Sequence, residues 1–210
     1  MRVTEIFHSI QGESSHAGKP CVFVRFTGCD LRCGYCDTAY AFHGGREMSE
    51  EAILAAISEY PPRFVCLTGG EPMLQKGIEQ LASALVQRGY LVTVETHGQA
   101  PTGRLPPEVV KIVDIKTPGS GEVQADFSDL AHLTPRDEVK IVVTSFSDFL
   151  WAVEVVKRYR LQERGPLLFS PAWGQVEAKD LAAWLLESGL QARLQLQQHK
   201  YIWGPDVQGV

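Results

Sequence analysis

The chain carries six short apolar runs, and most of them are separated by enough residues to form a helix. Short apolar runs bounded by turn residues predict buried strands. The runs lie at 21–26, 64–68, 91–95, 110–115, 139–143 and 167–170, and a weaker alternating run follows at 192–197. Strands that alternate with helices predict a mostly parallel sheet with right-handed crossovers.

Four amphipathic stretches supply the predicted helices. Each has apolar residues three or four positions apart, which places them on one helical face. The faces are Ile53, Leu54 and Ile57; Ile78, Leu81, Leu85 and Val86; Phe149, Val153, Val156 and Tyr159; and Leu181, Trp184 and Leu185. Ser49 and Ser147 precede the first and third stretches as predicted helix starts, and Gly89 and Gly189 mark predicted ends.

No helix is predicted between the third, fourth and fifth strands. A complete eight-fold (β/α) barrel usually needs about 250 residues, and this chain has 210. We therefore expect an α/β fold, an incomplete, open (β/α) barrel of mostly parallel strands, in a single domain over residues 1–210. In such folds the functional site lies at the carboxyl ends of the strands.

Composition excludes several classes of protein. The formal charge of -5 and the isoelectric point near 5.7 argue against a nucleic-acid partner, because binding phosphates requires a basic face. No run approaches the roughly 20 apolar residues of a membrane span. The residues 1–14 lack the apolar core of a signal peptide. We expect a cytoplasmic protein with no membrane contact.

Three of the five cysteines, Cys29, Cys33 and Cys36, follow one another with spacing Cys-x3-Cys-x2-Cys. An odd, clustered set does not suit a disulfide framework, and clustered thiols in a reducing compartment more often bind metal. A short loop can direct three such thiolates at one iron–sulfur cluster. Such clusters normally take four cysteines, so three leave one iron open for a substrate or cofactor. Cys21 and Cys66 lie in apolar strands and are expected to be core residues.

Two other interpretations of the cysteines remain open. A zinc site needs a fourth ligand, for which His43 is available, although zinc ligands usually come as two close pairs. The protein would then be a structural or binding module. The cysteines could also cluster by chance.

The cysteine run resembles the radical S-adenosylmethionine superfamily, because Tyr35 gives it the form Cys-x3-Cys-x-aromatic-Cys. Residues 67–72, Leu-Thr-Gly-Gly-Glu-Pro, are similar to the Gly-Gly-Glu-Pro motif of the same superfamily. Alone, that motif could be a strand-ending turn, but glycines let a backbone approach a ligand, and a carboxylate can accept an ammonium group. The resemblance implies a [4Fe-4S] cluster whose open iron is chelated by S-adenosylmethionine, and a 5′-deoxyadenosyl radical that abstracts a substrate hydrogen.

Four further segments resemble the 7-carboxy-7-deazaguanine synthase family, namely 6–14, 23–29, 36–38 and 198–200. The resemblance implies a ring contraction of 6-carboxy-5,6,7,8-tetrahydropterin to 7-carboxy-7-deazaguanine with loss of ammonia, on the route to queuosine. A carboxylate such as Glu13 can accept two adjacent N–H groups of a pterin, and Arg25 can hold a substrate carboxylate with two parallel bonds. Without the resemblance, Glu13 would be a solvated loop charge and Arg25 a surface ion pair.

The family's site residues carry over to positions spread along the chain. Substrate contacts are expected at Ile10, Gln11, Gly12, Glu13, Arg25, Thr68, His199 and Pro205. Cofactor contacts are expected at Tyr35, Cys36, Asp37, Gly70, Lys116, Thr117, Ser170, Pro171, Ala172 and Trp173. Thr38 is the expected ligand of a Mg²⁺ ion, which prefers oxygen and retains several waters; a threonine after aspartate is otherwise a turn or cap residue. The resemblance also implies an electron donor such as flavodoxin or ferredoxin, and a homodimer.

Two positions depart from the family pattern. His97 stands where relatives often have Asn or Ser, and Ser170-Pro171 replaces a common Gln-Pro. These differences bear on individual cofactor contacts. The rival enzyme class is a glycyl-radical-activating enzyme, which shares the cysteine spacing but acts on a protein partner. The role of residues 203–210 is not evident from the sequence.

Overall fold

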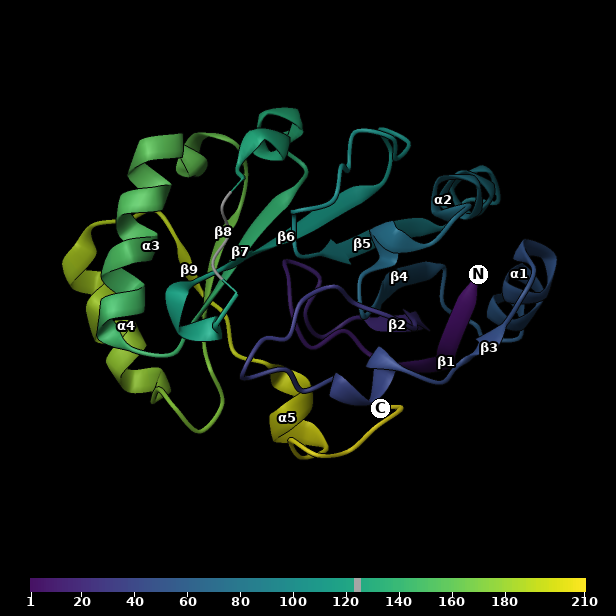
Figure 1. The fold of residues 1–210 in the computed structure, drawn as a ribbon, viewed down its shortest axis with the longest axis horizontal. Coiled ribbons are helices and arrows are strands. Elements are labelled where there is room, and N and C mark those ends of the chain that lie inside the picture. Colours follow the sequence, from purple (N-terminus) through teal and green to yellow (C-terminus); the bar gives the residue numbers. More distant parts are fainter. Residues whose placement is uncertain (123–125) are drawn as a thin grey trace.

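A computed structural model describes residues 1–122 and 126–210, and a nine-stranded sheet forms its centre (Figure 1). Its strand order is β3-β1-β2-β4-β5-β6-β7-β8-β9. The strands are β1 (Arg2–Ile10), β2 (Pro20–Phe26), β3 (Arg46–Glu47), β4 (Phe64–Gly69), β5 (Leu91–Thr96), β6 (Val110–Lys116), β7 (Glu138–Val143), β8 (Leu167–Pro171) and β9 (Arg193–Leu194). From β2 to β9 all neighbours are parallel, which confirms the predicted open, mostly parallel barrel.

Four helices cover the outer face of the curved sheet, two near each end (Figure 1). They are α1 (Glu50–Ser58), α2 (Ile78–Gln87), α3 (Phe146–Tyr159) and α4 (Ala178–Ser188). A fifth, α5 (Gln198–Ile202), lies apart from them near the end of the chain. The described residues that connect β5, β6 and β7 form no α-helix, as the sequence predicts, and contain only the short 3-10 turns η3 (Pro118–Ser120) and η4 (Ser128–His132). No helix in the described part of the chain is long and apolar enough to cross a membrane.

The apolar core lies between the sheet and these helices in two clusters. In the first, Ile53 and Leu81 of α1 and α2 pack with Leu67 of β4. In the second, Phe149 of α3 packs with Phe169 of β8. The helical faces predicted from the sequence are therefore the ones that cover the sheet, and they leave its carboxyl ends free for the site.

The strand β1 was not predicted from the sequence. It pairs antiparallel with β2 and β3, so the sheet extends two strands, β1 and the two-residue β3, beyond the first predicted strand. A register shift between Val3 and Glu5 interrupts its alternation, and residues facing away from the core are polar. A half-buried strand with a bulge leaves a weaker sequence signal than a fully buried one.

Two element boundaries also differ. The N-terminal cap of α3 is Ser145 and not Ser147, because the Ser145 hydroxyl accepts the Asp148 N–H at 3.2 Å. The last predicted strand shrinks from 192–197 to β9, since only two of its residues pair with β8. The predicted helix ends at Gly89 and Gly189 are confirmed, and both glycines adopt the left-handed conformation.

Candidate active site

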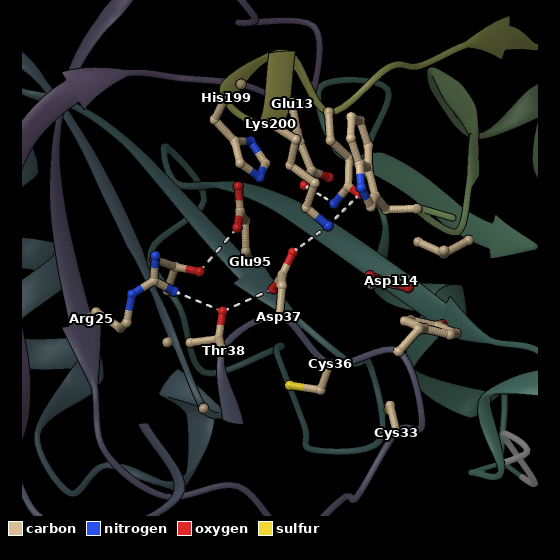
Figure 2. A pocket seen from close by; sticks show the side chains of 18 of the residues that line it. Glu13, Arg25, Cys33, Cys36, Asp37, Thr38, Glu95, Asp114, His199 and Lys200 are labelled. Carbon is tan, nitrogen blue, oxygen red and sulfur yellow. Dashed lines mark hydrogen bonds and ion pairs between the residues drawn. The ribbon is translucent and has the colours of Figure 1, made fainter. Parts of the chain in front are cut away.

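A cavity of about 790 Å³ opens at the carboxyl ends of the strands (Figure 2). Most predicted site residues line it, although they come from segments far apart in the sequence. The predicted residues in its wall are Ile10, Gln11, Gly12, Glu13, Arg25, Cys29, Cys33, Tyr35, Cys36, Asp37, Thr38, Thr68, Gly70, Lys116, Ala172, Trp173, His199 and Pro205. The fold thus brings the cysteine loop and the predicted substrate residues to one site.

Three predicted cofactor residues do not line the cavity. Thr117 is buried, and its hydroxyl donates to Asp148 at 2.8 Å and lies 3.2 Å from the Val142 carbonyl oxygen. Ser170 is buried inside β8 and its hydroxyl has no partner among the described residues. Pro171 ends that strand. Their side chains lie behind the cavity wall.

The loop that carries the three cysteines leaves β2 and returns along the cavity. Backbone hydrogen bonds fix it from both sides, since Gly28 N–H donates to Ala41 and Gly34 N–H donates to Ser120, each at 2.8 Å. A further bond from Cys36 N–H to the Cys33 carbonyl, at 3.1 Å, closes a turn between the last two cysteines. These bonds attach the loop to the segments on either side of it and give it a defined conformation.

The cysteine loop suits a three-thiolate iron–sulfur site. Cys29, Cys33 and Cys36 are free, partly exposed thiols in the cavity wall, close enough to influence one another's charge. Burial raises the pKa of all three thiols, and a bound metal would reverse this by stabilising the thiolates. Leu31 N–H donates to Cys29 Sγ at 3.4 Å, the kind of contact that tunes cluster sulfurs. Cys21 and Cys66 are fully buried in strands, as predicted.

The Gly-Gly-Glu-Pro segment braces the site. A side chain at Gly70 would collide with the Gly28 backbone, so glycine lets the end of β4 approach the cysteine loop. Glu71 is fully buried and accepts Met73 N–H and His97 N–H at 2.9 Å and the Thr96 hydroxyl at 2.8 Å. Its carboxylate joins the ends of β4 and β5, and the expected role of accepting a ligand ammonium group does not fit this geometry.

His97, which departs from the family pattern, contacts the cysteine loop. Its Nδ1 accepts Gln99 N–H at 3.1 Å, so Nε2 carries the proton and donates to Asp30 at 2.9 Å. Cys29, Asp30 and His97 offer ligand atoms within 4.8 Å of one another. The imidazole beside the cysteines is thus His97, whereas His43, the predicted fourth zinc ligand, is exposed.

Glu13 and Arg25, the two charged residues predicted to bind substrate, both line the cavity. Glu13 pairs with Lys140 at 2.5 Å and accepts from Gln197 at 2.8 Å. Arg25 uses Nε to pair with Glu5 at 2.8 Å and stacks over the ring of Tyr40. Arg25 therefore forms an ion pair with Glu5 and also lines the cavity. Its Nη1 points toward Thr38 in the cavity wall (Figure 2).

Several polar residues of the cavity were missed by sequence reasoning. Glu95 accepts from Gln11 at 3.2 Å and from Thr68 at 2.9 Å. Asp114 of β6 and Lys140 of β7 pair at 3.2 Å. Glu95 and Asp114 lie near the carboxyl ends of β5 and β6, and this position is the signal that would have found them. Lys140 lies in the middle of β7 and gives no such signal.

The end of the chain closes the cavity from the side opposite the sheet. Lys200 of α5 pairs with Asp37 at 2.7 Å (Figure 2), and Gln198 N–H donates to the Gly12 carbonyl at 2.9 Å. A side chain at Gly12 would collide with His199. Residues 205–210 line the same cavity. The segment whose role was not evident is thus part of the site.

Comparisons with known proteins agree with this geometry. Residues 23–115 match the model of the radical SAM superfamily. The 7-carboxy-7-deazaguanine synthase of Koribacter versatilis is 43% identical, with 100% of both chains covered. That of Chlorobaculum tepidum is 44% identical over 100% of this chain and 97% of the relative. A crystal structure of QueE from Escherichia coli shares the fold, with a TM-score of 0.78 over 94% of each chain at 24% identity.

An open parallel barrel with a three-cysteine loop at the carboxyl ends of its strands defines a radical S-adenosylmethionine enzyme. Full-length identities of this size specify the branch of that class. The chain belongs to the 7-carboxy-7-deazaguanine synthase family.

Proposed function

We propose that this chain converts 6-carboxy-5,6,7,8-tetrahydropterin into 7-carboxy-7-deazaguanine with loss of ammonia, in queuosine and deazapurine biosynthesis, and that residues 1–210 act as one domain. The observation that carries the proposal is a single cavity that holds three free thiols on one side and Glu13 and Arg25 on another. An acidic and a basic group at the same end match a substrate with both N–H donors and a carboxylate.

The cysteine side would hold the cofactors. Cys29, Cys33 and Cys36 would bind three irons of a [4Fe-4S] cluster. When bound together and reduced by one electron, the cluster and S-adenosylmethionine would supply methionine and a 5′-deoxyadenosyl radical able to remove a substrate hydrogen. The proposed contacts of S-adenosylmethionine are Tyr35, Cys36, Asp37, Gly70, Lys116, Ala172 and Trp173 in the cavity wall. Thr117, Ser170 and Pro171 do not line the cavity and would support these contacts from behind the wall.

The opposite side would bind the pterin. Glu13 would accept two N–H groups from the guanidine-like edge, while the outer nitrogens of Arg25 would grip the carboxylate. The remaining proposed contacts are Ile10, Gln11, Gly12, Thr68, His199 and Pro205, all of which line the cavity. Since Glu5 already holds Arg25 Nε at 2.8 Å, the guanidinium is oriented before substrate arrives.

A magnesium ion is proposed at Thr38. The Thr38 hydroxyl lies in the cavity wall, donates to Asp37 at 3.0 Å and is 3.4 Å from Arg25 Nη1. Figure 2 shows this hydroxyl between Arg25 and Asp37. One protein oxygen suffices for Mg²⁺, which completes its shell with water and substrate oxygens.

The resemblance supports three further features of the proposal. A flavodoxin or ferredoxin would reduce the cluster, two copies would form a homodimer, and the enzyme would act in the cytoplasm. The small-molecule substrate requires neither nucleic acid nor membrane.

The proposed function is tested by complementation. A bacterial strain that lacks its own 7-carboxy-7-deazaguanine synthase contains no queuosine in its tRNA. Expression of this chain should restore queuosine, measured by mass spectrometry of tRNA nucleosides, and the Cys33→Ala variant should not. Absence of queuosine with a soluble, iron-loaded chain would contradict the proposal.

A further inference from the structure

Lys140 sits between two carboxylates at the wall of the cavity. Its Nζ is 2.5 Å from Glu13 Oε2 and 3.2 Å from Asp114 Oδ2, and its side chain is 12% exposed. Lys116 Nζ reaches the same Asp114 oxygen at 3.1 Å. Lys116, Asp114, Lys140 and Glu13 thus form a row of alternating charge that runs from β6 across β7 to the loop after β1.

This arrangement fixes Glu13 without saturating it. One carboxylate oxygen is held by Lys140, and the other accepts from Gln197 Nε2 at 2.8 Å. Each carboxylate oxygen has two lone-pair sites, so both oxygens can accept one more bond from a ligand in the cavity. The carboxylate is therefore oriented in advance and still free to bind two N–H donors.

Lys140 also sets the charge of Glu13. Burial, the largest single effect, would raise the pKa of this carboxyl. The Lys140 ammonium is the largest opposing effect, and together with His199 and the hydrogen bonds from Lys140 and Gln197 it holds the pKa of Glu13 below its usual range. In return, although burial would lower the pKa of Lys140, Glu13 and Asp114 raise it well above its usual range. A neutral Glu13 would present an O–H to the substrate and lose one acceptor.

Other charged groups around Glu13 do not replace Lys140. They are Asp114 and Lys116 of β6, Glu95 of β5, Asp37 of the cysteine loop, and His199 and Lys200 of α5. Lys116 is paired with Asp114, and Lys200 with Asp37. Glu95 adds negative charge, and the effect of His199 on the pKa of Glu13 is smaller than that of Lys140.

We propose that Lys140 is a positioning residue, which acts through Glu13 by keeping its carboxylate oriented and anionic toward the paired N–H donors of the pterin. This rests on the proposed function, in which Glu13 contacts the pterin. Lys140 itself need not touch the substrate.

The test is Lys140→Met, which removes the charge and keeps a long apolar side chain. Loss of one partner of a buried charge pair is expected to raise the KM for the pterin by at least about tenfold and to lower kcat less. Because Glu13 would then take up a proton as pH falls, the ratio of KM at pH 6 to KM at pH 8 should increase relative to the unmodified protein. Lys140→Arg retains the charge and should keep the original ratio.

Lys111→Met is the matched control. Lys111 lies near the amino end of β6, away from the cavity at the carboxyl ends of the strands. There it pairs with Asp137 at 3.2 Å, and its side chain is 11% exposed. Removing it breaks a similarly buried pair, so a merely structural effect would appear there too. Its pH ratio should equal that of the unmodified protein, and iron content should be the same in all variants.

A double-mutant cycle with Glu13→Gln separates action through Glu13 from a direct contact. On the Glu13→Gln background, Lys140→Met should change KM by less than about threefold, since groups that act as a unit are non-additive. Additive losses, or an unchanged pH ratio in Lys140→Met, would overturn the role of Lys140 alone. If the unmodified chain failed to convert the pterin, the proposed function would fall and this inference with it.

Discussion

At the scale of single residues, burial divides the five cysteines into two kinds. Cys21 and Cys66 are fully enclosed in β2 and β4, where burial raises the pKa of each thiol far above its usual range and makes it inert. Cys29, Cys33 and Cys36 face the cavity. Only the second kind is accessible to iron and to a cofactor bound on it.

Single substitutions of the cysteines should follow this division. Cys29→Ala, Cys33→Ala and Cys36→Ala should each lose the cluster, because two thiolates cannot hold three irons, whereas Cys66→Ala should retain it and lose only packing, about 1 kcal/mol. Iron per chain after anaerobic reconstitution is the measurement. A normal iron content in any of the three, or its loss in Cys66→Ala, would refute the assignment.

Thr38 offers a second residue-scale prediction. If its hydroxyl binds Mg²⁺, the ion should raise turnover in the unmodified protein, and Ca²⁺ should substitute poorly because it prefers longer bonds and more ligands. Thr38→Ala should weaken this dependence, while Thr38→Ser should preserve it. Titrating Mg²⁺ against turnover in the three proteins tests the role. An unchanged Mg²⁺ response together with reduced iron in Thr38→Ala would instead assign Thr38 to the turn after Cys36.

At this scale, the sequence predicts site residues that lie in a continuous motif and misses those that stand alone. The cysteine loop and Glu13 lie in continuous motifs and were found. Glu95 and Lys140 are charged residues within mostly apolar strands, and their importance arises from neighbours on other strands and loops. Pairing across strands is a property of the folded sheet and cannot be read from a local pattern.

At the scale of elements, the start of α3 shows how a hydrogen bond decides a boundary. Two serines, Ser145 and Ser147, precede the apolar face of the helix. The structure chooses Ser145, which caps Asp148 N–H. This choice places Asp148 in the first turn, where its carboxylate accepts from Gly119 N–H at 2.8 Å and from the Thr144 hydroxyl at 2.7 Å. The helix start is therefore tied to the loop after β6.

The two serines form a natural pair of variants. Ser145→Ala should lower the free energy of unfolding by about 1 kcal/mol, because it removes an N-terminal cap. Ser147→Ala is the control and should change it by less than about 0.5 kcal/mol, as is usual for an exposed position. Urea denaturation followed by circular dichroism gives both values. Equal effects, or a larger loss in Ser147→Ala, would contradict the observed boundary.

At the scale of the whole molecule, the site depends on contacts between the two ends of the chain. The loop after β1 supplies Gln11 to Glu13, and α5 docks on it through the bond from Gln198 to Gly12. The parallel sheet and its helices were predictable from periodic apolar patterns. The docking of α5 over the cavity was not predictable, because α5 is only five residues long and shows no extended apolar periodicity.

Removal of residues 205–210 tests the closure. This segment lines the cavity, so its deletion should admit water and raise the KM for the pterin by about tenfold, equivalent to about 1.4 kcal/mol. Iron content should be unchanged, since the cysteine loop is held by bonds to Ala41 and Ser120. An unaltered KM would show that the segment does not contribute to substrate binding.

The central claim is that the cysteine loop and the Glu13–Arg25 end of the cavity act together on one pterin. The most direct measurement is product analysis by mass spectrometry after anaerobic incubation of the iron-loaded protein with S-adenosylmethionine, a reductant and 6-carboxy-5,6,7,8-tetrahydropterin. The predicted result is 7-carboxy-7-deazaguanine, with one ammonia released for each pterin consumed. Cleavage of S-adenosylmethionine with the pterin recovered intact would contradict the account.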